Sequence, residues 1–314
     1  MRAGTSGRTS IAGVLELRAV PESELAERQE LLVDRAVARR QRLSYQDAAT
    51  ARETTTADLA RSSDTRRFYE VVDGDDVVGW VAWSTGNGES VVSDLVFDDG
   101  RSSADLLPAA VELARSDGSR YLGISKVPGE PGRDGLAGAE GMVRRATNMA
   151  LPLDGVIGDP GGLELRPMTQ PAFEAWLAHS TEEYVGELAA AGMTPEAARA
   201  QGEKQMGELV PDGLASPGQS FFTAWVGETS VGTFWISTER PLAFVYDIAV
   251  DESQRRKGYG EAIMNAGARW ARDLGHPALG LNVFGHNPNA RALYDKLGYR
   301  VTQDFWSVDL GDAG

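Results

Sequence analysis

The chain repeats itself once, at a spacing of about half its length. Val78–Thr85 aligns with Val231–Thr238, and Asp94 aligns with Asp247 at the same offset. Further along, the offset grows by four residues, because the first copy lacks four residues of the stretch Arg255–Gly260. A repeat of roughly 150 residues is typical of duplicated domains rather than of a solenoid of short repeats. The sequence therefore predicts two copies of one fold.

The ends of the two copies predict the domain boundaries. Leu15–Arg18 recurs as Leu163–Arg166, so each copy begins with the same short strand. Between them, Leu151–Gly162 is rich in proline and glycine, which interrupt both helix and strand periodicity. We expect a loose tail over residues 1–13, a first domain over 14–155, a linker over 156–162 and a second domain over 163–314.

Composition restricts the class of protein without naming an activity. Hydrophobic residues make up 42% of the chain, and no apolar run approaches the ~18 residues of a membrane span, so we expect a soluble protein without a membrane partner. The tail lacks the apolar segment of a signal peptide. The absence of cysteine excludes disulfides, thiolate metal ligands and a cysteine nucleophile, and it fits a cytoplasmic location. The net charge of −15 argues against nucleic acid and suits a cationic substrate, although it could also serve solubility alone.

The second copy has an alternating α/β pattern. Strands are expected at residues 163–166, 221–226, 230–237, 243–250, 279–283 and 303–310, and helices at 171–190, 195–209, 259–274 and 288–297. Thr194 and Asn287 each precede a proline, so each is a natural N-cap for the helix that follows.

One stretch has the features of a phosphate site. The strand Phe244–Val250 leads through Arg255–Gly260 into a helix, and a helix N-terminus presents free backbone N–H groups and a positive dipole end to anions. Glycine at 258 and 260 would permit a close approach of phosphate and a positive φ. The stretch also carries three basic side chains in an otherwise acidic chain, Arg255, Arg256 and Lys257. A plain turn with a solvated basic edge is the structural alternative.

Two common phosphate motifs are excluded by spacing. A dinucleotide fingerprint would need glycine where Ile263 stands, and no Gly-Lys-Ser/Thr follows for a Walker A loop. The pattern Arg255-x-x-Gly258-x-Gly260 after a strand is followed by Asn287, Ala290, Leu293, Tyr294 and Gly298. In this order the residues resemble the acetyl-CoA signature of the GNAT superfamily of N-acyltransferases, over roughly residues 163–310.

The resemblance implies a fold, a co-substrate and a set of site residues. The fold would be α/β, with two tandem GNAT-like domains, each a mixed, mostly antiparallel central sheet flanked by helices. Acetyl-CoA would be the acyl donor, with no metal, and its pyrophosphate would be held by backbone amides of the loop. The implied contacts to it are Ile248, Ala249, Val250, Arg255, Arg256, Lys257, Gly258, Tyr259, Gly260 and Asn287.

Tyr294 matches the frequent general acid of that superfamily. A thiolate that leaves a thioester gains from a proton donor, and a tyrosine with a pKa near ~10 is still protonated at neutral pH. The structural alternative is an aromatic on the core face of the last helix, beside Leu293 and Leu297. In the first copy the equivalent position is Ala137, so the phenol is absent there.

The general base is expected to be Asp247 or an ordered water. Strand alternation places Val245, Asp247 and Ala249 on one face and Tyr246 on the other, without saying which face meets the substrate. Asp94 holds the same place in the first copy, which favours a structural role for this carboxylate. Three residues of the helix expected to cover the acceptor could instead select an amine or form a solvated face, Glu182, Glu183 and Tyr184.

The first copy is predicted to be non-catalytic. Phe97–Ser103 replaces the phosphate loop with two carboxylates and one glycine, and carboxylates repel pyrophosphate. This copy could complete a wall of the acceptor site or stabilise the pair. The actinobacterial mycothiol synthases share this arrangement of two GNAT copies with one catalytic half.

The predicted function is transfer of an acetyl group from acetyl-CoA to an amine, by direct attack in a ternary complex. The acceptor is a small molecule or a peptide, and a homodimer is compatible with the sequence. An acetyl-CoA sensor or a scaffold without turnover is the alternative from another class. His179, His276 and His286 lack metal-ligand spacing, and no Ser-His-Asp arrangement is visible, which argues against a metalloenzyme or a hydrolase.

Overall fold

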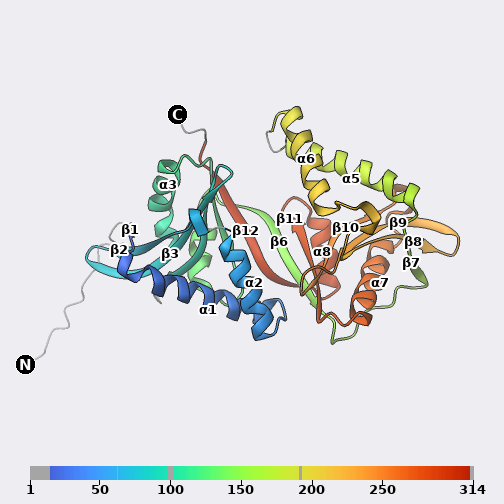
Figure 1. Cartoon of the computed structure of the whole chain (residues 1–314), viewed down its shortest axis with the longest axis horizontal. Helices are drawn as coiled ribbons and strands as arrows, with labels where there is room; N and C mark the ends of the chain where they lie inside the picture. Colours follow the sequence, from blue (N-terminus) through green and yellow to red (C-terminus); the bar gives the residue numbers. More distant parts are fainter. Residues whose placement is uncertain (1–14, 62, 98–101, 191–192, 312–314) are drawn as a thin grey trace, which may run out of the picture.

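The computed structural model describes residues 15–61, 63–97, 102–190 and 193–311. Within these residues, one sheet of twelve strands runs through the whole molecule, with helices packed on both faces (Figure 1). The expected tail over residues 1–13 lies outside the described residues, as do Asp98, Asp99, Gly100 and Arg101 of the predicted degenerate loop.

The two halves of the chain have the same order of strands and main helices. The N-terminal half contains β1 (Leu15–Ala19), η1 (Glu22–Glu24), α1 (Leu25–Leu43), α2 (Ala48–Ala60), η2 (Ser63–Thr65), β2 (Arg67–Asp73), β3 (Asp76–Gly86), β4 (Glu89–Phe97), η3 (Ser103–Leu106), α3 (Leu107–Ser116), β5 (Tyr121–Lys126), η4 (Pro131–Arg133), α4 (Asp134–Ala137) and β6 (Val143–Pro152). The C-terminal half contains β7 (Leu163–Pro167), α5 (Gln170–Ala190), α6 (Pro195–Leu209), η5 (Gly213–Ala215), β8 (Gln219–Val226), β9 (Thr229–Ser237), β10 (Ala243–Val250), η6 (Glu252–Gln254), α7 (Tyr259–Asp273), β11 (Ala278–Phe284), α8 (Pro288–Lys296) and β12 (Arg300–Asp309).

Helices begin where the capping residues predict. The Thr194 side chain accepts a hydrogen bond from the N–H of Ala197 at 3.3 Å, with Pro195 as the first residue of α6. Apolar clusters lie on both faces of the sheet in the C-terminal half: α7 and α8 cover one face, and α5 and α6 cover the other. The expected α/β class, with a mostly antiparallel sheet flanked by helices, is confirmed.

The last strands of the two halves are exchanged. The strand order is β1-β2-β3-β4-β5-β12-β6-β11-β10-β9-β8-β7, so β6 pairs with β11 and β12 pairs with β5. The exchanged strands also pair with each other at the centre of the molecule, where both run between the halves in Figure 1. Each half is therefore completed by a strand of the other half, and a continuous ladder of backbone hydrogen bonds joins them.

A β-bulge occurs at the same position in both halves. Opposite β9, Val245 pairs with Ile236 and Asp247 pairs with Trp235, so Tyr246 is the extra residue of β10. In the N-terminal half the register between β3 and β4 shifts at the equivalent step, which leaves one unpaired residue before Asp94.

The bulge corrects the alternation expected from sequence. Val245 packs in the same cluster as Ile248 on the α7 side, whereas Tyr246 packs among the aromatic residues on the α5 side and Asp247 is hydrogen-bonded to α5. Strict alternation had grouped Val245 with Asp247 and Ala249. An extra residue in a strand interrupts the alternation of its side chains between the two faces. The predicted faces of Val245 and Tyr246 relative to Asp247 were therefore wrong.

After the bulge, the two central parallel strands of each half separate. β10 pairs with β11 only from Ala243 to Val245, while its later residues remain paired with β9 up to Val250. In the N-terminal half, β4 pairs with β5 only from Glu89 to Val92. Each half therefore has a gap between two parallel strands at their carboxyl ends.

In the N-terminal half an arginine fills this gap. The Arg133 guanidinium, which is fully buried, donates to the carbonyl of Ser93 on β4 at 3.1 Å and to the carbonyl of Ser125 on β5 at 3.3 Å. It also lies 2.7 Å from a carboxylate oxygen of Asp94. Arg35 from α1 adds two further hydrogen bonds to Asp94, at 3.0 and 3.1 Å. The two strands are thus bridged by a side chain rather than by each other.

No helix of the described residues is both long and apolar enough to cross a lipid bilayer.

Replacing Arg133 with methionine should destabilise the protein by about 3 kcal/mol, because the buried Asp94 loses its closest charge partner. Urea denaturation at neutral pH measures this change. Arg52→Met is the control, since Arg52 is 59% exposed and its pair with Asp34 is a surface ion pair. Equal stability of the two variants would contradict the bridging role of Arg133.

The contribution of Asp94 should depend on pH. Burial by itself would raise its pKa, but Arg133 and Arg35 outweigh burial and lower the pKa from 3.8 to about 2. A lowered pKa stabilises the fold above the unfolded value, and this contribution of about 2 kcal/mol is lost as the pH falls from ~5 to ~2. The stability difference between wild type and Asp94→Asn, measured by urea denaturation, should therefore shrink by about that amount over this range. A difference that stays constant would show that the charge of Asp94 is unimportant.

Candidate active site

Three elements of the C-terminal half meet at the gap between β10 and β11. β10 ends at Val250, α7 begins after Gly258, and α8 packs against both through the partly buried Leu293. Tyr294 of α8 belongs to the same apolar cluster. The residues predicted for the co-substrate and for catalysis therefore lie on elements that are packed together.

The turn into α7 depends on two residues with left-handed backbone conformations. Gly258 is the N-cap of α7 with a φ of 85°, and Arg256 has a φ of 68°. Only glycine adopts such a φ without strain, so the predicted conformational reason for glycine at 258 is confirmed. The N–H of Ala262 bonds to the carbonyl of Gly258 at 3.1 Å, whereas the N–H groups before it precede the first helical hydrogen bond. These donors are what an anion needs at a helix N-terminus.

Gly260 differs from the expectation in its backbone conformation. Its φ is not positive, and a Cβ built on it would lie 3.4 Å from Leu293 Cδ2 and 3.8 Å from Val250 Cγ2. Both distances are ordinary van der Waals contacts, so the space between α7, α8 and the end of β10 admits a methyl group and little more. A larger side chain would displace α8, which carries Tyr294.

The basic side chains of the loop are exposed and held by local hydrogen bonds. Arg255 Nε donates to the carbonyl of Val250 at 3.3 Å, and Lys257 Nζ donates to the carbonyl of Ser253 at 3.2 Å. Arg256 is exposed, and Tyr259 packs partly against the main apolar cluster. The loop thus offers positive charge to solvent at the start of α7.

The end of β10 has one unpaired edge. Ile248, Ala249 and Val250 pair with β9 but with no residue of β11 in the described structure. Their N–H and C=O groups on the β11 side therefore face the gap, where an extended ligand could add as a strand.

Tyr294 is buried beside this gap. Its pKa is raised to about 12, first by burial and then by the negative charge of Asp247. The phenol therefore remains protonated at any physiological pH, as a proton donor requires. Because the charge of Asp247 changes the pKa of the Tyr294 hydroxyl, the structure places the two predicted catalytic residues close enough to interact electrostatically.

Asp247 lies on the α5 side of the gap and is tied to that helix. Trp176 Nε1 donates to its carboxylate at 2.9 Å. Burial raises the pKa of Asp247, the Trp176 hydrogen bond lowers it in part, and the charge of Glu183 raises it again. A carboxylate with a raised pKa accepts a proton more readily than an ordinary aspartate does.

Asp94 and Asp247 occupy equivalent positions in the two halves, but their pKa values are shifted in opposite directions. Asp94 follows the same bulge but is held by Arg35 and Arg133, which lower its pKa to about 2. Asp247 has no ion pair with a lysine or arginine among the described residues, and its pKa is raised. A structural role for Asp94 therefore does not imply the same role for Asp247.

Asn287 caps α8 as predicted. Its side-chain oxygen accepts a hydrogen bond from the N–H of Ala290 at 3.0 Å. Lys296 at the end of α8 pairs with Glu261 in the first turn of α7 at 2.5 Å, so the two helices are also joined by charge.

Sequence reasoning missed three residues at these two gaps. Trp176 lies in the helix expected over residues 171–190, and nothing in its spacing indicates a hydrogen bond to Asp247. Tyr299 packs 5.7 Å from Tyr294, ring centre to ring centre, and its buried hydroxyl has no hydrogen-bond partner among the described residues. Arg133 aligns with Ala290 of the second copy, and this replacement was a signal that the sequence offered.

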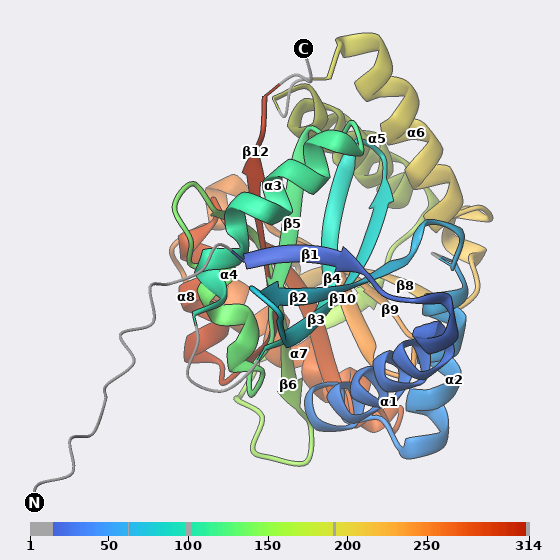
Figure 2. The same cartoon turned by 90° about the vertical axis from the view of Figure 1, so that its left-hand side faces the viewer.

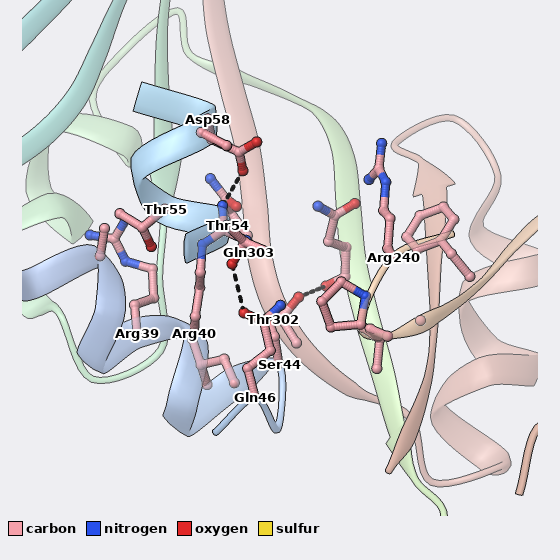
Figure 3. A pocket seen from close by; sticks show the side chains of 18 of the residues that line it. Arg39, Arg40, Ser44, Gln46, Thr54, Thr55, Asp58, Arg240, Thr302 and Gln303 are labelled. Atoms are coloured by element: carbon pink, nitrogen blue, oxygen red, sulfur yellow. Dashed lines mark hydrogen bonds and ion pairs between the residues drawn. The ribbon is translucent and has the colours of Figure 1, made fainter. Parts of the chain in front are cut away.

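A cleft of about 1200 Å³ lies between the two halves. Figure 3 shows Arg39, Arg40 and Thr54 of the N-terminal half on one side and Arg240 of the C-terminal half on the other, with β12 between them. Neither Asp247 nor Tyr294 lines this cleft.

The floor of the cleft is continuous with the face of the sheet that carries Asp247. Phe244 lines the cleft and contacts Tyr246, with 5.4 Å between ring centres. Asn148 also lines it and accepts a hydrogen bond from Asn282 of β11 at 2.8 Å. Figure 2, turned by 90°, shows the helix pairs α1/α2 and α5/α6 at the same side of the molecule.

Known acetyltransferases resemble the C-terminal half of the chain. Residues 176–299 match the Acetyltransferase (GNAT) family. The chain is 34% identical over 152 residues to the uncharacterized N-acetyltransferase YycN of Bacillus subtilis (strain 168), covering 46% of this chain and 97% of YycN. It is 27% identical over 277 residues to a mycothiol acetyltransferase of Nocardiopsis dassonvillei, covering 79% of this chain and 82% of that protein.

A solved structure extends the likeness to most of the chain. A GCN5-related N-acetyltransferase from Sphaerobacter thermophilus has a TM-score of 0.53 and 16% identity, covering 94% of this chain and 96% of its own. At that identity the likeness concerns the fold alone. The similarity to YycN, at 34% identity over nearly its whole length, is stronger. The chain belongs to the GNAT family of acetyltransferases.

Proposed function

We propose that the chain transfers an acetyl group from acetyl-CoA to an amine of a small molecule or peptide, within a complex that holds both substrates. The observation that supports this most is the gap between β10 and β11, with the Gly258 turn at one end and Tyr294 and Asp247 beside it. Binding, proton donation and proton acceptance are thereby offered at one place.

The C-terminal half has the features that acetyl-CoA requires. The N–H groups at the start of α7 and the cationic Arg255–Lys257 stretch would hold the pyrophosphate. The open edge of Ile248–Val250 would pair with the pantetheine arm, and Asn287 would contact the co-substrate from the start of α8. Acetyl-CoA supplies a thioester whose carbonyl carbon the amine attacks.

Asp247 and Tyr294 divide the proton transfers. A protonated amine loses two protons in forming an amide. Asp247, with its raised pKa, accepts one and passes it to water. Tyr294 donates a proton to the leaving thiolate and is restored by the second proton from the nitrogen, so one proton is released overall. The buried phenol is well suited to this donation because it stays protonated.

We also propose that the N-terminal half is a non-catalytic domain, with the division between domains at residues 156–162. Its gap is filled by Arg133, which bonds to both separated strands at the place where the second half has Ala290. Ala137 stands where Tyr294 would be needed. The inter-half cleft supports a role for this domain as one wall of the approach to the acceptor site.

A mycothiol acetyltransferase is the second candidate. Its support is the alignment with the Nocardiopsis dassonvillei protein over 79% of this chain, which extends across both halves. An acetyl-CoA sensor without turnover has no specific observation in its favour, and the protonated Tyr294 beside the gap supports turnover.

Gly260→Asp should abolish acetyl-CoA binding, because the new side chain displaces Leu293 and places a carboxylate beside the pyrophosphate site. Isothermal calorimetry should give one acetyl-CoA per wild-type chain and none for the variant. Gly207→Asp is the matched control, since Gly207 lies on an exposed part of α6 with nothing within 4 Å of an added Cβ. Retained binding in Gly260→Asp, or two molecules per wild-type chain, would contradict the site assignment.

Tyr294→Phe should lower turnover about 100-fold while acetyl-CoA affinity stays within about twofold, because only proton donation to the thiolate is lost. Turnover is followed by free thiol release with a panel of amines, and affinity by calorimetry. Tyr299→Phe is the matched control: it removes a neighbouring buried hydroxyl that has no hydrogen-bond partner among the described residues. Equal turnover in both variants would exclude Tyr294 as the general acid.

A further inference from the structure

The helices α1 and α5 are equivalent residue by residue. The alignment that places Leu15 on Leu163 also places Val37 on Val185, and both valines are buried. The backbone agrees at the start of both helices: Val20 N bonds to the carbonyl of Phe68 at 3.0 Å, and its counterpart Met168 N bonds to the carbonyl of Phe221 at 2.9 Å. Positions on the two helices can therefore be compared directly.

This comparison shows a reversal of charge above the conserved aspartate. Arg35 aligns with Glu183, and Arg39 aligns with Glu187. In the N-terminal half, Arg35 forms a two-point contact with Asp94, Nε to Oδ2 at 3.0 Å and Nη2 to Oδ1 at 3.1 Å. In the C-terminal half the same helix position carries a carboxylate, Glu183, whose negative charge raises the pKa of Asp247.

No lysine or arginine of the described residues compensates this negative charge at Asp247. The charged and titratable groups that act on it are Glu183 and His179 from α5, and it acts in turn on Tyr294 from α8. Trp176 from α5 contributes a neutral hydrogen bond. His179 lies 3.4 Å from Glu183, and both side chains are largely exposed. The two carboxylates repel each other, solvent screens the exposed Glu183 in part, and a cation bound beside both would relieve the repulsion that remains.

We propose that the acceptor binds as a cation between Glu183 and Asp247, at the place that the Arg35 guanidinium occupies in the N-terminal half. This rests on the proposed acetyl transfer and adds the class of acceptor: an alkyl amine that is protonated at neutral pH, rather than a neutral aryl amine. Glu183 is a specificity residue that attracts the ammonium, and Asp247 then takes one of its protons. The net charge of −15 favours the approach of such a cation.

The N-terminal half serves as an internal reference for the helix position that holds Arg35 in one half and Glu183 in the other. The same fold, bulge and aspartate occur twice in one chain, once with an internal cation and once without. Where the cation is internal, the neighbouring gap is also closed by Arg133. Where it is absent, the gap is open and Tyr294 is present. We therefore expect a bound cation only in the C-terminal half, where the gap is open and Tyr294 lies beside it.

Methylguanidinium, which reproduces the end of the Arg35 side chain, tests the site without turnover. The full-length protein is titrated with it at low ionic strength and followed by ligand-observed NMR. Glu183→Gln should weaken binding about three- to fivefold, as expected for one partly exposed charge pair. Glu183→Arg should abolish binding, because it supplies the internal cation. Glu182→Gln is the matched control, since Glu182 is exposed on the same helix and pairs with Arg199 at 3.0 Å.

The two proposals fail in distinguishable ways. Calorimetry with acetyl-CoA should give the same affinity for wild type and all three variants, and loss of this binding in wild type would overturn the proposed function. Failure of wild type to bind methylguanidinium, or equal binding by wild type, Glu183→Gln and Glu183→Arg, would overturn the cation site while leaving acetyl transfer standing.

Discussion

The separation of β10 from β11 is the constraint on which the rest of the C-terminal half depends. Parallel strands normally continue their ladder, and here it ends at Val245 because the bulge at Tyr246 changes the direction of β10. The strand keeps its hydrogen bonds to β9, so only one edge is left open. Asp247 is placed on one side of that opening by the bulge, and Tyr294 is placed beside it by α8.

The N-terminal half meets the same constraint in another way. Its two parallel strands separate at the same step. The backbone groups that line the resulting gap are buried, so they need hydrogen-bond partners. Arg133 supplies the donors and Asp94 balances its charge, so the gap becomes part of a buried ionic cluster. The shorter loop and the bridging arginine are consistent with each other, because the Arg133 side chain occupies the space between the two strands.

The exchange of β6 and β12 makes the two halves one structural unit. Each sheet is completed by a strand from the other half, so the degenerate half is needed for the integrity of the half with the candidate active site. The same arrangement places α1 and α2 across the cleft from Arg240 (Figure 3), so residues of both halves line this cleft.

The sequence by itself determined the duplication, the order of the elements, the caps at Thr194 and Asn287, and the turn at Gly258, because these depend on local spacing and on backbone preferences of single residues. The strand exchange, the bulge and the bridge formed by Arg133 were decided only in the tertiary structure. A strand has no local signal for which of two equivalent neighbours it joins, and one extra residue in a strand looks like any other residue. The charge environment of Asp247 likewise depends on groups from α5 and α8 that are far away in the sequence, so one position holds an ion-paired carboxylate with a lowered pKa in one half and a carboxylate with a raised pKa in the other.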